Sequence, residues 1–345
     1  MSDYLIVGGN MKYPLRFLLV VVLACFFASG EIICQESIKL VTLATEESDW
    51  GSIFKEMNAD LIKASDERLR FDLTFAMEEK HQIDFMRKGQ FDAASLTTIG
   101  LGQVLEALFI FELPMLIMTY DELDFVRTEL MPEFSRIFEE SDYILLGWGD
   151  LGFTYLFSNK AISTQTDLRG TRLWACDINP IAEAFAAESG KDPVLASIGS
   201  VLSLLKLDKI DTVYASPYAC LALQWYAHVK YMSDLILAPG VGATIMRKKR
   251  YDSLPERDRK LLLEVSERHH RRLIQRIRER NVESIDVLKE NGIKIISIHP
   301  KEKQKWNDVA LRVQNKFAAK EKFFSKALLE RVRGLLEEYR GRKHP

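Results

Sequence analysis

The sequence is poor in the residues and motifs that carry metal, phosphate or covalent chemistry. It contains four cysteines and six histidines among 345 residues. No CxxC pair, GxSxG turn or P-loop occurs in it. His269 and His270 are adjacent, which places them about 100° apart on a helix, and we expect both at its surface. We therefore predict no cofactor, no metal site and no catalytic residues, and a protein that is not an enzyme.

The chain also lacks an excess of charge of either sign. Lys and Arg number 47, Asp and Glu number 49, and the formal net charge is −2. This balance gives no general attraction to nucleic acid or to anionic membranes. Basic residues crowd the region after Arg247, but they alternate with Glu and Asp at helical spacing, which is typical of a solvated helix face. Nucleic acid is therefore not a predicted partner.

Long hydrophobic runs are scarce as well, and the one from Phe17 to Ala28 is too short to span a bilayer comfortably. Its length and the preceding Arg16 are typical of a signal peptide, and Met11 is then the expected start of translation. Cleavage after Gly30 and lipidation of Cys25 both fit the flanking residues, and an uncleaved anchor is a third alternative. Each of them places the body of the protein outside the cytoplasm, in the periplasm.

Four cysteines are too few for a disulfide framework in a chain of this length. Cys25 and Cys34 belong to the export segment and the residues that follow it. Cys176 and Cys220 each follow a predicted strand and could approach one another. We expect them to be buried free thiols, because free cysteine behaves as a small core hydrophobe.

Hydrophobic residues make up 47% of the chain and charged residues 28%, so it can bury a full core and is long enough for two lobes. The apolar pattern alternates between periods of two and 3.6, which predicts an α/β fold. Phe157 and Trp225 are expected in its core. The predicted strands are 38–45, 71–75, 91–96, 143–146, 173–175, 212–215 and 293–298, and the predicted helical segments are 50–64, 81–88, 180–189, 201–205 and 301–339.

One long helix is predicted between Ser253 and Asn291. The segment from Ser253 to Glu256 has the pattern of a capping box with an early proline, and Asn291-Gly292 is a stop signal. Apolar residues recur between them at helical spacing, with no internal Gly or Pro. At 1.5 Å per residue the helix would span about 50 Å, enough to underlie both lobes.

The segment from Gly147 to Gly152 matches the dinucleotide motif GxGxxG letter by letter. That motif must open a helix, so that a phosphate meets free backbone N–H groups. Here residues 153–157 are expected to continue as a strand. A cofactor loop is therefore not predicted.

Two segments, GWGDLGFTYLFSN at 147–159 and DLRGTRL at 167–173, resemble the DctP-type solute-binding proteins of tripartite ATP-independent periplasmic (TRAP) transporters. In that family the second segment reads D-L-K-G-x-K-I-R-V, and its arginine clamps a substrate carboxylate. The position of this arginine falls on Trp174. A second family arginine, in the pattern G-F-R, falls on Thr154, and the asparagine of an N-P pair falls on Ser216. The resemblance implies that the scaffold is kept and the anion clamp is removed.

The resemblance covers nearly the whole chain after the export segment at 1–30. It implies a two-lobed, periplasmic-binding-protein-like α/β fold with crossing hinge strands and a long helix spanning both lobes. Lobe 1 would comprise 31–152 and 243–283, and lobe 2 would comprise 153–242 and 284–345. Such a receptor captures a solute by hinge closure and delivers it to the TRAP membrane permease subunits.

Ligands of two-lobed α/β receptors sit at the carboxyl ends of strands, where the lobes face each other. A buried carboxylate without a paired cation is costly, so the missing arginines favour a hydrophobic or non-carboxylate ligand. The residues predicted to bind it are Glu46, Trp50, Thr97, Thr98, Leu113, Phe153, Thr154, Trp174, Ser216, Tyr218 and Gln224.

Two other functions stay open. Part of this family is associated with periplasmic tetratricopeptide-repeat proteins, and a hydrophobic cargo would suit a handover to such a partner. The other is a periplasmic enzyme on a binding-protein fold, which needs a perturbed acid, base or nucleophile in the cleft. Glu46 is the acid that we would nominate, and no catalytic partner for it is evident.

Overall fold

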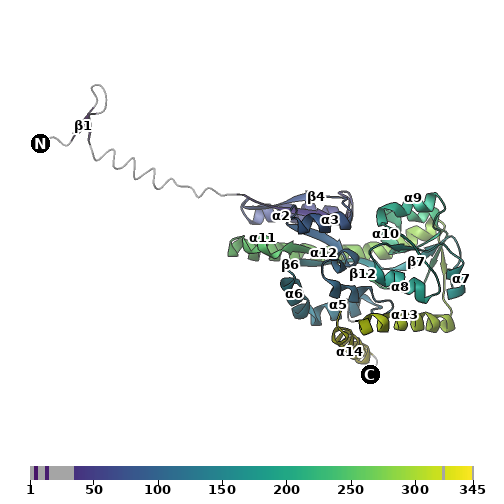
Figure 1. Ribbon diagram of the computed structural model, residues 1–345. Coiled ribbons are helices and arrows are strands. Elements are labelled where there is room, and N and C mark those ends of the chain that lie inside the picture. Colours follow the sequence, from purple (N-terminus) through teal and green to yellow (C-terminus); the bar gives the residue numbers. More distant parts are fainter. Residues whose placement is uncertain (1–3, 7–11, 15–34, 321–322, 344–345) are drawn as a thin grey trace. The chain divides into compact units, whose positions relative to one another are not determined.

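The computed structural model describes residues 4–6, 12–14, 35–320 and 323–343 (Figure 1). The chain divides into two units, residues 1–36 and 37–345. In the first unit, strands β1 (Tyr4–Ile6) and β2 (Lys12–Pro14) pair antiparallel. The predicted signal run, with Gly30 and Cys25, lies outside the described residues. Among those described, no helix is both long and apolar enough to cross a bilayer.

A five-stranded sheet in the order β4-β3-β5-β12-β6 is the centre of what we call the first lobe. Strand β5 pairs parallel with β3, whereas β12 pairs antiparallel with β5 and with β6. The strands are β3 (Glu36–Thr42), β4 (Leu69–Thr74), β5 (Ala93–Thr97), β6 (Tyr143–Phe153) and β12 (Pro239–Arg247), and the helices are α2 (Asp49–Ala64), α3 (Glu79–Arg87), α4 (Thr98–Gly102), η1 (Glu106–Glu112), α5 (Tyr120–Glu129), α6 (Met131–Glu140) and α11 (Lys248–Asp252).

A four-stranded sheet in the order β10-β7-β11-β13 is the centre of the second lobe. The predicted core residues Phe157 and Trp225 are buried beside it, which confirms both predictions. Strands β8 (Trp174–Cys176) and β9 (Val194–Ala196) pair separately. The remaining elements are β7 (Tyr155–Ser158), β10 (Thr212–Ala215), β11 (Tyr231–Ser233), β13 (Lys294–Ile296), α7 (Gln165–Arg169), α8 (Pro180–Glu188), η2 (Ile198–Ser200), α9 (Val201–Lys206), α10 (Pro217–Ala222) and η3 (Trp225–His228).

Two segments cross between the lobes and hydrogen-bond to each other. Strand β6 passes into β7 at Thr154, and β11 leads through residues 234–238 into β12. The Thr154 N–H donates to the Ala238 carbonyl, and the Leu237 N–H donates to the Thr154 carbonyl, both at 2.9 Å. The Thr154 hydroxyl also donates to the Ala238 carbonyl at 3.0 Å. These segments are the crossing strands that the resemblance implied.

Helix α12 (Glu256–Glu290) is one continuous helix of 35 residues, as predicted. It contacts β6 and α2 of the first lobe and α10 of the second, and Figure 1 shows it extending from one to the other. The predicted capping box is wrong. The Ser253 hydroxyl donates back to the Arg250 carbonyl at 2.6 Å, so this residue closes α11 instead, and α12 begins after Pro255 without a side-chain cap.

The glycines of strand β6 allow other elements to lie directly on it. A Cβ atom at Gly147 would meet the His270 ring at 2.4 Å, and one at Gly149 would meet the Trp50 ring at 2.4 Å. Gly152 faces the Asn281 side chain in the same way and has a φ of +98°, which an L side chain rarely adopts. The prediction that this segment is strand is confirmed, and its glycines serve packing against α12 and α2.

The prediction that His269 and His270 lie at the surface of the helix is wrong, because they are 1% and 2% exposed. His269 Nε2 lies 2.8 Å from Asp60 Oδ2 on α2. His270 Nδ1 lies 2.7 Å from the Ser266 carbonyl, and its Nε2 lies 2.7 Å from the Thr244 hydroxyl. Burial lowers the pKa of His270 to about 4, so this ring is neutral in the folded protein near pH 7.

The last two helices, α13 (Pro300–Lys320) and α14 (Lys326–Lys343), contact elements of different lobes. Helix α13 packs on α8, and α14 packs on α5. The buried Gln314 side chain donates to the Pro114 carbonyl at 2.7 Å. Arg340 pairs with Glu122 at 2.8 Å.

A buried carboxylate fixes α12 to β6 and α5. Asp150 is 0% exposed in the middle of β6. Arg127 of α5 donates to it at 2.8 Å, and Arg278 of α12 donates to it at 2.6 Å. Both arginines also bind Asp124. Buried charges need such pairing, because a lone buried ion loses its hydration without compensation.

Replacing Asp150 by Ala should therefore lower the free energy of unfolding by about 3–5 kcal/mol, since it leaves two guanidinium groups short of a partner. Urea denaturation followed by circular dichroism measures this loss. Glu140→Ala is the matched control. It breaks an exposed ion pair with Arg136 and should cost about 0.5 kcal/mol or less. Equal losses for the two variants would contradict the assignment.

Candidate functional site

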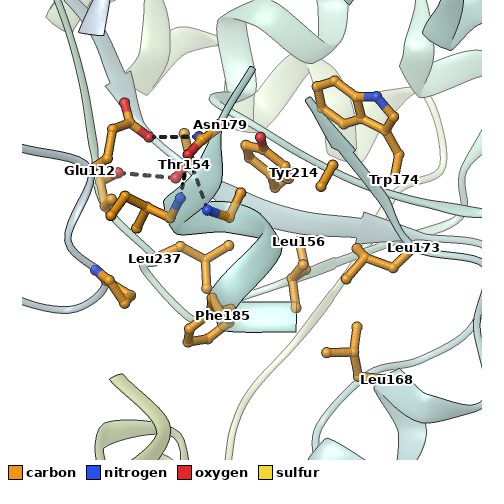
Figure 2. Close-up of a pocket in the computed structure, with 15 residues that line it drawn as sticks. Glu112, Thr154, Leu156, Leu168, Leu173, Trp174, Asn179, Phe185, Tyr214 and Leu237 are labelled. Carbon is orange, nitrogen blue, oxygen red and sulfur yellow. Dashed lines mark hydrogen bonds between the residues drawn. The ribbon is translucent and has the colours of Figure 1, made fainter. Parts of the chain in front are cut away.

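A cavity of about 50 Å³ lies between the two lobes (Figure 2). Residues from η1 of the first lobe, from both crossing segments and from β8, α8 and β10 of the second lobe surround it. Among the described residues that line it, none is Lys, Arg or His. The lining residues are Glu112, Pro114, Thr154, Leu156, Leu168, Leu173, Trp174, Ala175, Asn179, Ile181, Ala182, Phe185, Tyr214, Leu237 and Ala238.

One end of the cavity is polar. Figure 2 shows Glu112, Thr154 and Asn179 together there, and the Asn179 amide donates to the Glu112 carboxylate at 3.2 Å. Asn179 is held in place because it is the N-cap of α8, where its side-chain oxygen accepts from two backbone N–H groups at 3.1 Å. Glu112 ends η1, so this hydrogen bond joins the two lobes.

Further hydrogen bonds cross between the lobes near this point. The Ser197 hydroxyl donates to Glu78 at 3.1 Å, and the Gln103 amide donates to the Ile178 carbonyl at 3.0 Å. A second cavity of about 50 Å³ lies beside Glu78 and Ser197, and the exposed Lys80 lines it. The lobes are therefore in contact in this structure, with small spaces left between them.

The other side of the cavity is apolar and aromatic. Trp174 stacks on Tyr214 with ring centroids 4.9 Å apart, and it meets Trp225 edge to face at 5.5 Å. The Trp174 indole N–H donates to the Ala196 carbonyl at 2.9 Å. Trp174 is only 2% exposed, so it belongs to the core of the second lobe while lining the margin of the cavity.

Two carboxyl groups in this region have strongly raised pKa values. Glu79 is 5% exposed and accepts hydrogen bonds from the backbone N–H and the hydroxyl of Thr97. Burial raises its pKa to about 7 in spite of these bonds. Burial likewise raises the pKa of Glu112 to about 7, against the hydrogen bond from Asn179, and the nearby Glu79 adds to the rise.

Glu112 retains some accessible surface although its carboxyl is strongly desolvated. The two observations agree for a side chain that lies in a narrow cavity between the lobes, where protein atoms surround its carboxyl group. It is the one carboxylate among the described residues that line this cavity.

A larger groove of about 720 Å³ lies elsewhere, on the first lobe alone. It is lined by residues of α5, α6, β6 and α12, among them Trp148 and His270. We take the smaller cavity as the candidate site, because its described lining combines residues of both lobes with the two crossing segments.

The structure brings two of the predicted ligand-binding residues, Thr154 and Trp174, to this cavity. Leu113 is fully buried between two lining residues. Phe153 packs on Tyr120 beside Thr154, with ring centroids 4.9 Å apart. Thr97 binds Glu79, and the buried Thr98 donates to the Val241 carbonyl at 2.7 Å.

The other predicted residues lie away from the cavity. Trp50 and Tyr218 meet in a small apolar cluster against α12, where the Tyr218 hydroxyl donates to Asp49 at 3.0 Å. Ser216 caps α10. Glu46 is exposed and pairs with Lys55 at 3.5 Å. Gln224 is exposed in a left-handed conformation between α10 and η3.

The predicted set lacks Glu79, Glu112, Asn179 and Tyr214. The role of Asn179 as a helix N-cap could have been predicted from the sequence, because Asn directly before Pro is typical of the start of a helix. Glu112 directly precedes the predicted ligand-binding residue Leu113, but it stands in an apolar segment, and nothing in the sequence indicates that Asn179 meets it.

Cys176 and Cys220 are buried and free, as predicted. Burial raises the pKa of the Cys176 thiol to about 12 and that of Cys220 further still. Both thiols are therefore protonated and unreactive near pH 7. Groups of three or more potential metal ligands do not occur in the part of the chain that the structure describes.

Two α/β lobes joined by crossing strands and one long helix, with a cavity between them, define the class of two-lobed solute-binding proteins. The family model for bacterial extracellular solute-binding protein, family 7 (DctP), matches residues 41–321. The chain therefore belongs to this family, which is one of solute-binding proteins and not of enzymes. No curated protein matches its sequence.

Solved TRAP periplasmic solute-binding proteins share the fold at low sequence identity. One from Ralstonia eutropha with bound (S)-2-acetolactate has a TM-score of 0.81 at 18% identity, covering 88% of this chain and 99% of that one. A receptor from Bordetella pertussis that binds pyroglutamic acid has 0.80 at 16%, with coverage of 88% and 99%. One from Shewanella oneidensis with succinate has 0.80 at 15%, again with 88% and 99%. The predicted two-lobed fold is confirmed.

Stability should depend on pH through Glu79. Its folded pKa of about 7 exceeds the ordinary value of 4.5, so the folded protein keeps this proton where the unfolded chain loses it. The stabilisation of the folded protein by protonated Glu79 is complete below pH 4.5 and is lost as the pH rises through 7. Glu79→Gln cannot ionise, so its stability relative to wild type should increase between pH 5 and pH 8, by on the order of 2 kcal/mol.

Denaturation curves of both proteins at pH 5, 6, 7 and 8 measure this change. A difference between them that stays constant with pH, or that shrinks as the pH rises, would contradict the raised pKa.

Proposed function

We propose that this protein is the extracytoplasmic solute receptor of a TRAP-type secondary transporter and binds a hydrophobic or non-carboxylate small molecule between its lobes. The observation that carries this proposal is the composition of the inter-lobe cavity. Its walls are apolar and aromatic, its polar end holds a carboxylate, and none of its described lining residues is a cation. A carboxylate ligand would be desolvated there without a counter-charge, at a cost of several kcal/mol.

The solved relatives named above hold acetolactate, pyroglutamic acid and succinate, all of which are carboxylic acids. The two positions at which the resembling family carries arginine are Thr154 and Trp174, and both line the cavity. Thr154 uses its hydroxyl on the Ala238 carbonyl, and Trp174 uses its indole N–H on the Ala196 carbonyl. Neither side chain supplies the paired donors that a bidentate arginine would. The ligand of this protein is therefore expected to belong to another chemical class than the carboxylic acids held by those relatives.

Ligand capture would work by closure of the lobes about the crossing strands and α12. Asn281 of α12 donates to the Leu151 carbonyl of the first lobe at 3.1 Å and accepts from the Tyr218 N–H of the second at 3.2 Å, which supports a hinge at this helix. We propose 31–152 and 243–283 as lobe 1 and 153–242 and 284–345 as lobe 2, with the exception of α14. Because α14 packs on α5, that last helix would move with lobe 1.

The proposed location is the periplasm, reached by a signal peptide with cleavage after Gly30 or lipidation of Cys25. The proposed partners are the ligand and the permease subunits of the transporter. A periplasmic tetratricopeptide-repeat protein is a further proposed partner, supported by the apolar cavity, since a hydrophobic cargo benefits from a shielded handover. Co-purification of such a repeat protein with the native receptor would test this partner.

An enzyme on this fold is the weaker alternative. The raised pKa values of Glu79 and Glu112 are a feature of many active sites. However, Glu79 is engaged with Thr97, the Cys176 thiol is protonated near pH 7, and the nominated Glu46 is exposed and ion-paired. The described cleft residues thus include acids without a paired nucleophile.

The protein should not bind C4-dicarboxylates or sialic acid with sub-micromolar affinity. Isothermal titration of the mature protein with succinate, malate, fumarate and sialic acid measures this directly, and mass spectrometry of what co-purifies with the native protein identifies the natural ligand. Sub-micromolar binding of any of these acids would refute the ligand class while leaving the receptor role intact. A co-purifying carboxylate would do the same.

A further inference from the structure

We propose that the ligand of the inter-lobe cavity is a small organic cation, a protonated amine held by Glu112 at the polar end with a short apolar body packed against the opposite wall. This inference rests on the proposed receptor function and narrows its ligand class. Three observations carry it, namely the charge of the lining, the geometry of the acceptors and the shape of the apolar wall.

The charge of the lining favours a cation. Glu112 is the carboxylate of the cavity, and the buried Glu79 stands close enough to raise its pKa. The other titratable groups around it are Tyr214 and Cys176, whose pKa values burial also raises, so both are neutral near pH 7. The exposed Lys80 lines the neighbouring cavity instead. Above their raised pKa values of about 7 the Glu112 and Glu79 carboxyl groups are ionised, so at pH 8 they would attract an ammonium group and repel a carboxylate.

The hydrogen-bond acceptors at the polar end favour a ligand that donates hydrogen bonds. Glu112 receives the Asn179 amide on its Oε2 atom, and its carboxyl also lies within hydrogen-bonding reach of the Thr98 side chain. A carboxylate offers about four lone-pair sites on two oxygens, so these two partners leave capacity for a further donor. The Asn179 oxygen is already occupied by the two N–H groups of α8. Glu112 is therefore the acceptor that remains for the polar head of the ligand.

The rest of the cavity fits a hydrocarbon body. Figure 2 shows Leu156, Phe185 and Leu237 along the wall that continues from the polar end, with Tyr214 across from them. Aromatic faces attract an organic cation through their quadrupole, in addition to excluding water. The cavity of about 50 Å³ admits a very small molecule, and movement of the lobes sets how much longer the body can be.

Straight-chain ammonium, alcohol and carboxylate series of one to six carbons separate charge from size. Titrated calorimetrically into the wild-type protein at pH 8, the best ammonium should bind at least tenfold tighter than the alcohol of equal length, and the carboxylates should give no binding heat. Its affinity should rise from pH 6 to pH 8, because Glu112 loses its proton over this range while the ammonium keeps its own.

Glu112→Gln keeps the shape and the bond to Asn179 but removes the charge. It should weaken ammonium binding at least tenfold and leave alcohol binding unchanged. Glu106→Gln is the matched control, because Glu106 belongs to the same η1 but is exposed and does not line this cavity. It should leave both affinities unchanged. Should the Glu112 variant fail to fold, the wild-type series alone decides the sign of the charge.

The outcomes separate the two proposals. Alcohols that bind as tightly as ammonium ions would overturn the cation and leave an apolar-ligand receptor. Carboxylates that bind best would overturn both ligand proposals. No binding by any ammonium would overturn the cation, while a neutral ligand found with the native protein would still support the receptor.

Discussion

The close contact between helix α12 and strand β6 is the constraint on which the arrangement of both lobes depends. The strand supplies glycines where the helix and Trp50 need room, and the buried Asp150 where Arg278 needs a partner. The same helix carries Asn281, which bonds to β6 of one lobe and to α10 of the other. Because β6 runs on into the crossing segment, the helix and the crossing strands form one structural unit. The contact itself lies outside the cavity, but the crossing segment that follows β6 lines the cavity at Thr154.

Much of this fold could be predicted from the sequence, because apolar periodicity is a local property. The strands, the continuous long helix and the buried Phe157 and Trp225 follow from it. The two histidines could not be placed in this way. They belong to a highly charged helix, yet both are buried. Asp60 hydrogen-bonds to His269 and Thr244 to His270, and both partners come from distant parts of the chain. The Ser253 cap failed for a local reason, since its hydroxyl has a nearer acceptor in the Arg250 carbonyl.

The candidate site was predictable only at the points where a strand ends or a family motif departs from its pattern. Thr154 and Trp174 were found by this route, and both line the cavity. Glu112 and Asn179 could not be identified by this route, because they matter as a hydrogen-bonded pair. The two residues are 67 positions apart in the sequence and lie on different lobes. A single carboxylate leaves no motif, since any apolar segment can contain one Glu. Only the three-dimensional arrangement shows that it faces the inter-lobe cavity, where none of the described lining residues is Lys, Arg or His.

The hydrogen bonds across the cleft also set how the protein behaves before any ligand arrives. The bonds of Glu112 to Asn179, Ser197 to Glu78 and Gln103 to Ile178 join groups of the protein itself. Each such bond contributes on the order of 1 kcal/mol net, so together they would favour closure with or without a ligand. A receptor that closes without cargo can also present itself to its permease without cargo. Productive transport then requires the permease to distinguish a closed receptor with cargo from one without. If the cargo is a cation, Glu112 is ionised when cargo is bound and can be protonated when it is not. This difference in protonation is one that the permease could detect.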